Sequence, residues 1–169
     1  MFEWFTEFME SPLGKLISTG ILAVAVLLLT LAVSASAAAV KMTVGVRFWR
    51  ESGDKESMAD SAVDTTREAT LTRQPNGTFT LELPVKQLSS MNMTGCLTGI
   101  AIGEVNYDGT LSGDLSDGTA VLTLKNLPAS VLTGSDSSKA LAVTCSIKMD
   151  TILLGDITTS AKMSIWVER

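Results

Sequence analysis

The chain has 169 residues, enough for one ordinary domain, and its 18 acidic against 13 basic side chains give a formal net charge of −5. No cluster of Lys or Arg is present, which argues against a nucleic-acid partner because neutralising phosphates requires a basic face. The absence of histidine removes the commonest metal ligand and the usual general base near neutral pH.

The amino-terminal part of the chain divides into two pieces. Residues 1–15 are acidic and carry aromatic side chains at helical spacing, which favours a short interfacial helix. Residues 16–39 begin with the uncharged run LISTGILAVAVLLLTLAV (16–33), which is long enough to cross a bilayer. The same run, followed by Ala-Ser-Ala at 35–37, also fits a cleaved secretory signal. We therefore expect either a transmembrane helix that tethers an extracellular domain to the cell membrane, or a signal peptide and a secreted domain.

From residue 40 onward the apolar residues follow the two-residue period of β-strands. In MTVGVRFWR (42–50) three apolar side chains share one face, namely Val44, Val46 and Phe48. Residues 69–85 read as a hairpin, because Pro-Asn-Gly at 75–77 supplies turn chemistry between two alternating arms. Both segments predict strands with one buried face.

The later part of the chain continues in the same way. Further strands are predicted in four stretches: CLTGIAIGEVNYDG (96–109), GTAVLTLKNL (118–127), ALAVTCSIKM (140–149) and AKMSIWVER (161–169). Seven or eight short strands without helical periodicity predict an all-β domain over residues 40–169. Its expected form is an immunoglobulin-like antiparallel β-sandwich.

The two cysteines, Cys96 and Cys145, are too far apart in sequence for a CxxC motif. On neighbouring strands they could form a disulfide that contributes about 3 to 4 kcal/mol in the chain-entropy model. The alternative is a pair of buried thiols that behave as small apolar groups. We expect the disulfide, which suits an exported protein.

The motifs of common enzymes are absent from the sequence. There is no GxSxG, no Cys with His, no metal-ligand cluster and no phosphate-binding loop. Asp114 and Asp117 lie among Gly and Ser, where a solvated turn explains them. We therefore expect neither an enzyme nor a metal site.

The sequence also contains several short motifs in a specific order. A strand is followed by an acidic loop with Ser-Met-Ala at 57–59, a hairpin written NGTFTLEL, a strand written DGTAVLTLKNL, and the terminal pair VTCSIKM and AKMSIWV. This order resembles the NEAT (near-iron-transporter) domain over residues 42–168. That family comprises immunoglobulin-like modules of Gram-positive cell surfaces, many of which bind haem or haemoproteins in iron acquisition.

The resemblance implies a haem pocket whose lip is the loop after the first strand. In haem-binding members this loop forms a short 3₁₀ turn, and its serine hydrogen-bonds a haem propionate. Ser57 matches that serine, and Met58 and Ala59 would lie over the porphyrin. Without the family, the same residues are explained by Met58 filling the end of the sandwich and Ser57 capping the turn.

The iron-binding half of the family's site is missing. Its Tyr-x-x-x-Tyr motif corresponds to Ile157 and Ala161, and the sole tyrosine, Tyr107, lies in a predicted turn. The thioethers of Met58 and Met163 are then the remaining candidate iron ligands. The alternation of Met163 with Ile165 and Val167 favours a core position for it instead.

Two functions follow from the sequence. The first is an exported NEAT-like binding module for haem or a haemoprotein, tethered to the membrane through residues 16–33 or secreted. The alternative is a structural β-sandwich subunit of a surface assembly or filament, without haem binding.

Overall fold

The computed structural model describes residues 38–53, 55–90, 93–150 and 155–168. The chain divides into two units, Met1–Ala38 and Ala39–Arg169. The interfacial helix predicted at 1–15 and the membrane or signal segment at 16–33 lie outside the described residues. Within the part that is described, no helix is long and apolar enough to span a membrane.

The described residues of the second unit form ten β-strands and three short 3₁₀ helices. In chain order they are β1 (Val40–Arg50), η1 (Met58–Ala62), β2 (Ala69–Arg73), β3 (Phe79–Pro84), β4 (Leu88–Ser90), β5 (Met93–Ile102), β6 (Val105–Asp108), β7 (Thr110–Ser112), β8 (Val121–Leu127), η2 (Ala129–Val131), η3 (Ser137–Lys139), β9 (Leu141–Met149) and β10 (Asp156–Val167). All the pairings between strands are antiparallel. The predicted all-β, immunoglobulin-like sandwich is confirmed, and it is built from more strands than the seven or eight that the sequence indicated.

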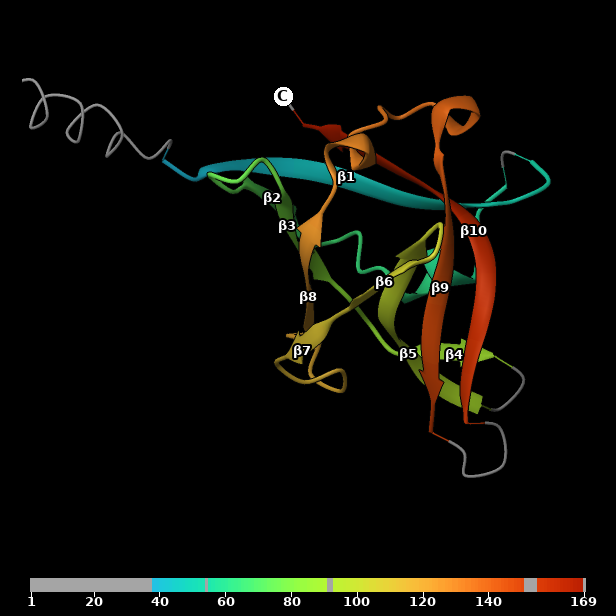
Figure 1. The fold of residues 1–169 in the computed structure, drawn as a ribbon. Coiled ribbons are helices and arrows are strands. Elements are labelled where there is room, and N and C mark those ends of the chain that lie inside the picture. Colours follow the sequence, from blue (N-terminus) through green and yellow to red (C-terminus); the bar gives the residue numbers. More distant parts are fainter. Residues whose placement is uncertain (1–37, 54, 91–92, 151–154, 169) are drawn as a thin grey trace, which may run out of the picture. The chain divides into compact units, whose positions relative to one another are not determined.

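Strand β1 joins the two halves of the sandwich. The strand order is β4-β5-β9-β10-β1-β2-β3-β8-β7, with β6 paired to β5 (Figure 1). The first half of β1 pairs with β2, from Val40 opposite Arg73 to Val44 opposite Ala69. Its second half pairs with β10, from Val44 opposite Val167 to Arg50 opposite Ala161. Because β5 and β6 also contact β8, the two halves face each other across one core.

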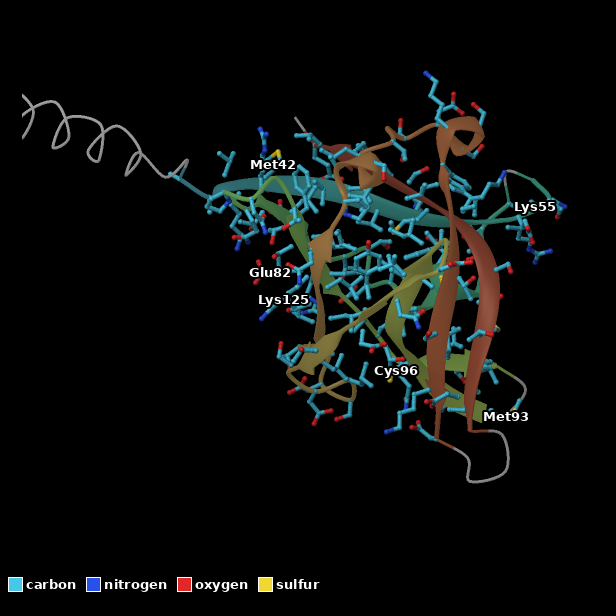
Figure 2. The ribbon with its side chains drawn as sticks, in the orientation of Figure 1. Met42, Lys55, Glu82, Met93, Cys96 and Lys125 are labelled. Atoms are coloured by element: carbon cyan, nitrogen blue, oxygen red, sulfur yellow. The ribbon has the colours of Figure 1, made fainter. Side chains whose placement is uncertain are left out.

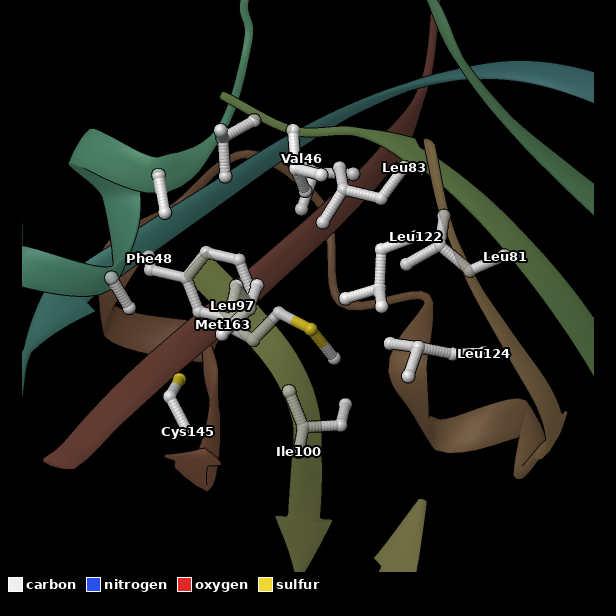
Figure 3. Packing of buried hydrophobic residues seen from close by; sticks show 14 of the residues in the cluster. Val46, Phe48, Leu81, Leu83, Leu97, Ile100, Leu122, Leu124, Cys145 and Met163 are labelled. Carbon is white, nitrogen blue, oxygen red and sulfur yellow. The ribbon is translucent and has the colours of Figure 1, made fainter. Parts of the chain in front are cut away.

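The core is formed by the alternating apolar residues of both halves. Phe48 on β1 lies close to Leu97 of β5 and Met163 of β10 (Figure 3). All three side chains are fully buried, and burying a side chain of this size contributes about 1.5 to 3 kcal/mol. The predicted inward face of β1, Val44, Val46 and Phe48, is therefore confirmed.

The hairpin predicted at 69–85 is formed by β2 and β3. Gly77 has φ +85°, which a residue with a side chain rarely adopts. The Asn76 carboxamide oxygen accepts hydrogen bonds from the Thr78 amide at 3.0 Å and from its hydroxyl at 2.7 Å. The turn chemistry read from Pro-Asn-Gly thus sets the register of the two strands.

The expected disulfide is wrong, and both cysteines are buried free thiols. Their strands β5 and β9 are neighbours, as the prediction required, but Cys96 is opposite Lys148 while Cys145 is opposite Ile100. Cys145 shares the core face with Ile147. Cys96, which is labelled in Figure 2, comes directly before the core residue Leu97 on β5, so its side chain points to the other face of the sheet. Side chains on opposite faces cannot reach the short Cβ separation that a bridge needs.

Candidate functional site

The loop between β1 and β2 is fastened to β1 by Asp60, a residue of η1. Its Oδ1 accepts a hydrogen bond from the Phe48 amide at 2.7 Å, and its Oδ2 accepts one from Arg47 Nη1 at 2.9 Å. The Ser57 amide donates to the Phe48 carbonyl at 2.8 Å. Asp60 is 5% exposed, so this carboxylate is satisfied in a largely dry environment, where charge-assisted hydrogen bonds are strong. The loop is therefore held in one position against the strand.

The three loop residues that the resemblance singled out lie in different environments. Ala59 is fully buried, while Met58 is 38% exposed at the edge of the domain. Ser57 is buried, and its hydroxyl has no hydrogen-bond partner among the described residues. Ser57 is the N-cap residue of η1, as predicted, but only its carbonyl takes part, accepting from the Asp60 amide at 3.1 Å, and its side chain makes no capping bond. Because Met58 is partly exposed, it does not fill the end of the sandwich either.

Met163 does not belong to this edge. It is fully buried on β10, opposite Phe48 of β1, and its thioether packs within the core (Figure 3). The proposed role of Met163 at a haem pocket is wrong, because no surface of the side chain is left for a ligand. Its alternation with Ile165, which is also fully buried, is the sequence signal that favours the core position.

The positions that correspond to the family's tyrosines also lie on β10. Ala161 is buried and Ile157 is half-buried, and both share the inward face with Met163. Tyr107 is on β6, opposite Ile100 of β5. η1 contacts both β10 and β5, so the fold brings the loop and the last hairpin together. Among the described residues, however, this arrangement presents no phenolate, imidazole or thiolate for iron.

A cavity of about 260 Å³ lies elsewhere, beside β1. Its lining comes from residues 44–47 of β1, residues 63–69 before and at the start of β2, and four further side chains: Leu83, Pro84, Trp166 and Glu168. None of Ser57, Met58 and Ala59 lines it. This cavity was not predicted from the sequence, in which residues 63–68 belong to the loop between two predicted strands. The one available signal was the glycine at position 45 inside a strand, which often marks close approach of another group.

Polar residues fix the loop wall of the cavity. The Asp64 carboxylate accepts hydrogen bonds from the Thr66 hydroxyl at 2.6 Å, the Thr66 amide at 3.1 Å and Arg67 Nε at 2.8 Å. The Thr66 hydroxyl, followed by the Arg67 guanidinium, lowers the pKa of Asp64 to about 2. The same guanidinium donates to the carbonyl of Ala120, which ties the loop to the chain just before β8.

Comparisons with known proteins concern the fold. No protein-family model matches the sequence, and no curated protein matches it. Among solved structures, the chain is similar to the NEAT5 domain of IsdX2, a B. anthracis hemophore, in complex with heme. The identity is 9% and the TM-score 0.49, over 78% of this chain and 98% of that chain. A mutant of the same domain, also in complex with heme, gives the same values. At this identity and TM-score the likeness says nothing about ligands, and the chain is similar to a NEAT domain in its fold alone.

Proposed function

We propose that this chain is a NEAT-like binding module, not an enzyme, and that it recognises a protein partner through the edge formed by η1. The observation that carries the proposal is that Asp60 holds η1 on β1 while Met58 stays 38% exposed. An adaptable apolar side chain on a rigid support suits a protein interface, because the side chain can fit the partner's surface while the backbone that carries it is already ordered. A haemoprotein is the partner that the NEAT resemblance implies.

Free haem fits this edge less well. Met163 is in the core, and Ile157 and Ala161 offer no iron ligand. The hydroxyl of Ser57 is buried, so in this position it offers no surface to a propionate. We therefore propose recognition of a haemoprotein surface without a side chain of this chain on the iron. The proposal includes export, with residues 16–33 serving as membrane anchor or signal.

The test compares a haemoprotein with free haemin. We expect the immobilised full chain to bind methaemoglobin, and haemin added to the same chain to show no Soret shift beyond that of haemin in buffer. Met58→Ala should weaken methaemoglobin binding about tenfold, which corresponds to about 1.4 kcal/mol.

The matched control is Leu111→Ala on β7, because Leu111 is 39% exposed and is also an apolar side chain at an edge. This variant should bind as the unchanged chain does. The proposal is wrong if methaemoglobin does not bind, or if both variants lose binding equally. A saturable Soret shift with haemin would instead establish a haem site.

A further inference from the structure

The cavity lies beside the part of β1 that has no partner strand on the β2 side. β2 begins at Ala69, opposite Val44, so no strand runs beside the next residues of β1 on that side. Pairing resumes at Phe48, whose amide and carbonyl bond to Asp60 and Ser57. Val46 lies between these two points and lines the cavity.

The backbone of Val46 points into this gap. In a strand, alternate residues direct both N–H and C=O to the same side. Phe48 bonds toward the η1 side, whereas the carbonyl of Thr43 accepts from Glu168 on the β10 side. Val46 therefore directs its N–H and C=O to the same side as Phe48. Within the described residues neither group has a ladder or loop partner.

The outer wall of the cavity is aromatic and acidic. The Trp166 indole lies against Gly45, where an added Cβ would meet ring atoms at 2.2 Å. Glu68 and Glu168 line the cavity and are exposed, and neither forms an ion pair within the described ranges. The two arginines of the lining are already engaged, Arg47 by Asp60 and Glu56, and Arg67 by Asp64. The cavity thus has an excess of negative charge next to an indole face.

We propose that this cavity binds a short extended peptide with basic side chains. One small peptide residue would pair with Val46, donating its N–H to the Val46 carbonyl and accepting from the Val46 amide, as a strand added to a sheet does. The side chain of that residue would share the inner face with Val46, so it must be small. Its neighbour would place a Lys or Arg side chain on the outer face, between Trp166 and the carboxylates of Glu68 and Glu168. The volume of about 260 Å³ is below the roughly 300–1,000 Å³ of pockets for drug-sized molecules, which suits one or two residues.

The experiment is a titration of the ¹⁵N-labelled full chain, followed by NMR, with three acetylated and amidated tripeptides. Lys-Ala-Lys should shift the Val46 amide and the Trp166 indole N–H in a saturable way. Glu-Ala-Glu tests the charge requirement. Lys-Ala-Lys with an N-methyl group on the Ala nitrogen tests the backbone pairing, because that nitrogen can no longer donate to Val46. We expect at least tenfold weaker binding of both control peptides.

Two variants locate the basic side chain. The double substitution Glu68→Gln and Glu168→Gln should weaken Lys-Ala-Lys about tenfold, while the exposed Glu104→Gln between β5 and β6 should leave it unchanged. An unshifted Val46 amide, or equal binding of Lys-Ala-Lys and its N-methylated form, would overturn the proposal. The site is separate from Met58, so Met58→Ala should not alter this titration.

Discussion

The carboxylate of Asp64 shows how one side chain can hold a polar loop. It accepts hydrogen bonds from both the amide and the hydroxyl of Thr66 and pairs with Arg67, and all three donors favour its charged form. Its pKa falls from 3.8 to about 2, with the Thr66 hydroxyl as the largest cause. Arg67 also donates a hydrogen bond to the carbonyl of Ala120, the residue before β8. The charge on Asp64 therefore stabilises the contact between this loop and the start of β8.

This pKa shift predicts a specific acid sensitivity. A group whose pKa is lower in the folded state contributes stability above its unfolded pKa and loses it as the pH falls through the folded value. Asp64 should therefore contribute roughly 1 to 2 kcal/mol above about pH 4, and this contribution should disappear between pH 4 and pH 2. The measurement is urea unfolding of the unchanged chain and of Asp64→Asn across this range. Their difference should shrink toward pH 2, whereas Glu104→Gln should show little difference at any pH, and a gap that stays constant would contradict the assignment.

The attachment of η1 to β1 depends on the buried carboxylate of Asp60, in the first turn of η1. Asp60 bonds to the Phe48 amide and to Arg47, while Glu56 also pairs with Arg47 from an exposed position, its side chain 63% accessible. These two acids contact the same guanidinium but differ in burial. Only Asp60 satisfies a backbone amide of β1, so only Asp60 should position the helix.

We expect Asp60→Asn to lower the free energy of unfolding by about 2 to 3 kcal/mol, because it weakens a buried, charge-assisted pair of hydrogen bonds. Glu56→Gln, the matched control, should cost less than about 1 kcal/mol, as exposed ion pairs do. Urea unfolding measures both. Methaemoglobin binding should also weaken in Asp60→Asn and not in Glu56→Gln. If both variants lowered the free energy of unfolding equally, Asp60 would not be the residue that holds η1 against β1.

For these elements, sequence patterns predicted some features and not others. The alternation in β1 and the turn at Asn76 and Gly77 were readable because both depend on neighbours along the chain. The 3₁₀ turn η1 was expected only from the NEAT resemblance, since its five residues carry no periodic signal. The attachment through Asp60 was not foreseen, because it joins η1 to a strand amide twelve residues earlier.

For the domain as a whole, the two cysteines are free thiols, so no bond between them contributes to stability. Cys145 is fully buried, and this burial raises the pKa of its thiol to about 12. Burial, and after it the charge of Asp150, raises the pKa of the Cys96 thiol as well. Both sulfurs therefore stay protonated near neutral pH and react slowly. Stability then rests on the packed core and the strand ladder.

The prediction is that reductant has no effect on the folded domain. A disulfide here would contribute about 3 to 4 kcal/mol, so dithiothreitol would lower the free energy of unfolding by that amount. We expect the urea unfolding curves with and without dithiothreitol to coincide. A thiol reagent at pH 8 should modify the two cysteines rapidly in urea and Cys145 only slowly in the folded chain. A fall of several kcal/mol on reduction would establish a bridge.

The amino-acid order alone was enough for the all-β class, for the inward face of β1 and for the lack of the family's tyrosine pair, because each of these depends on residue identity or on spacing within one segment. The pairing of distant segments, more than a hundred residues apart for β1 and β10, could not be predicted from that order. That pairing placed Cys96 and Cys145 on opposite faces of adjacent strands, put Met163 into the core beside Phe48, and opened the cavity at Val46 where β1 leaves β2. Register between distant strands depends on how all their side chains fit one shared core, and a one-residue slip reverses every face.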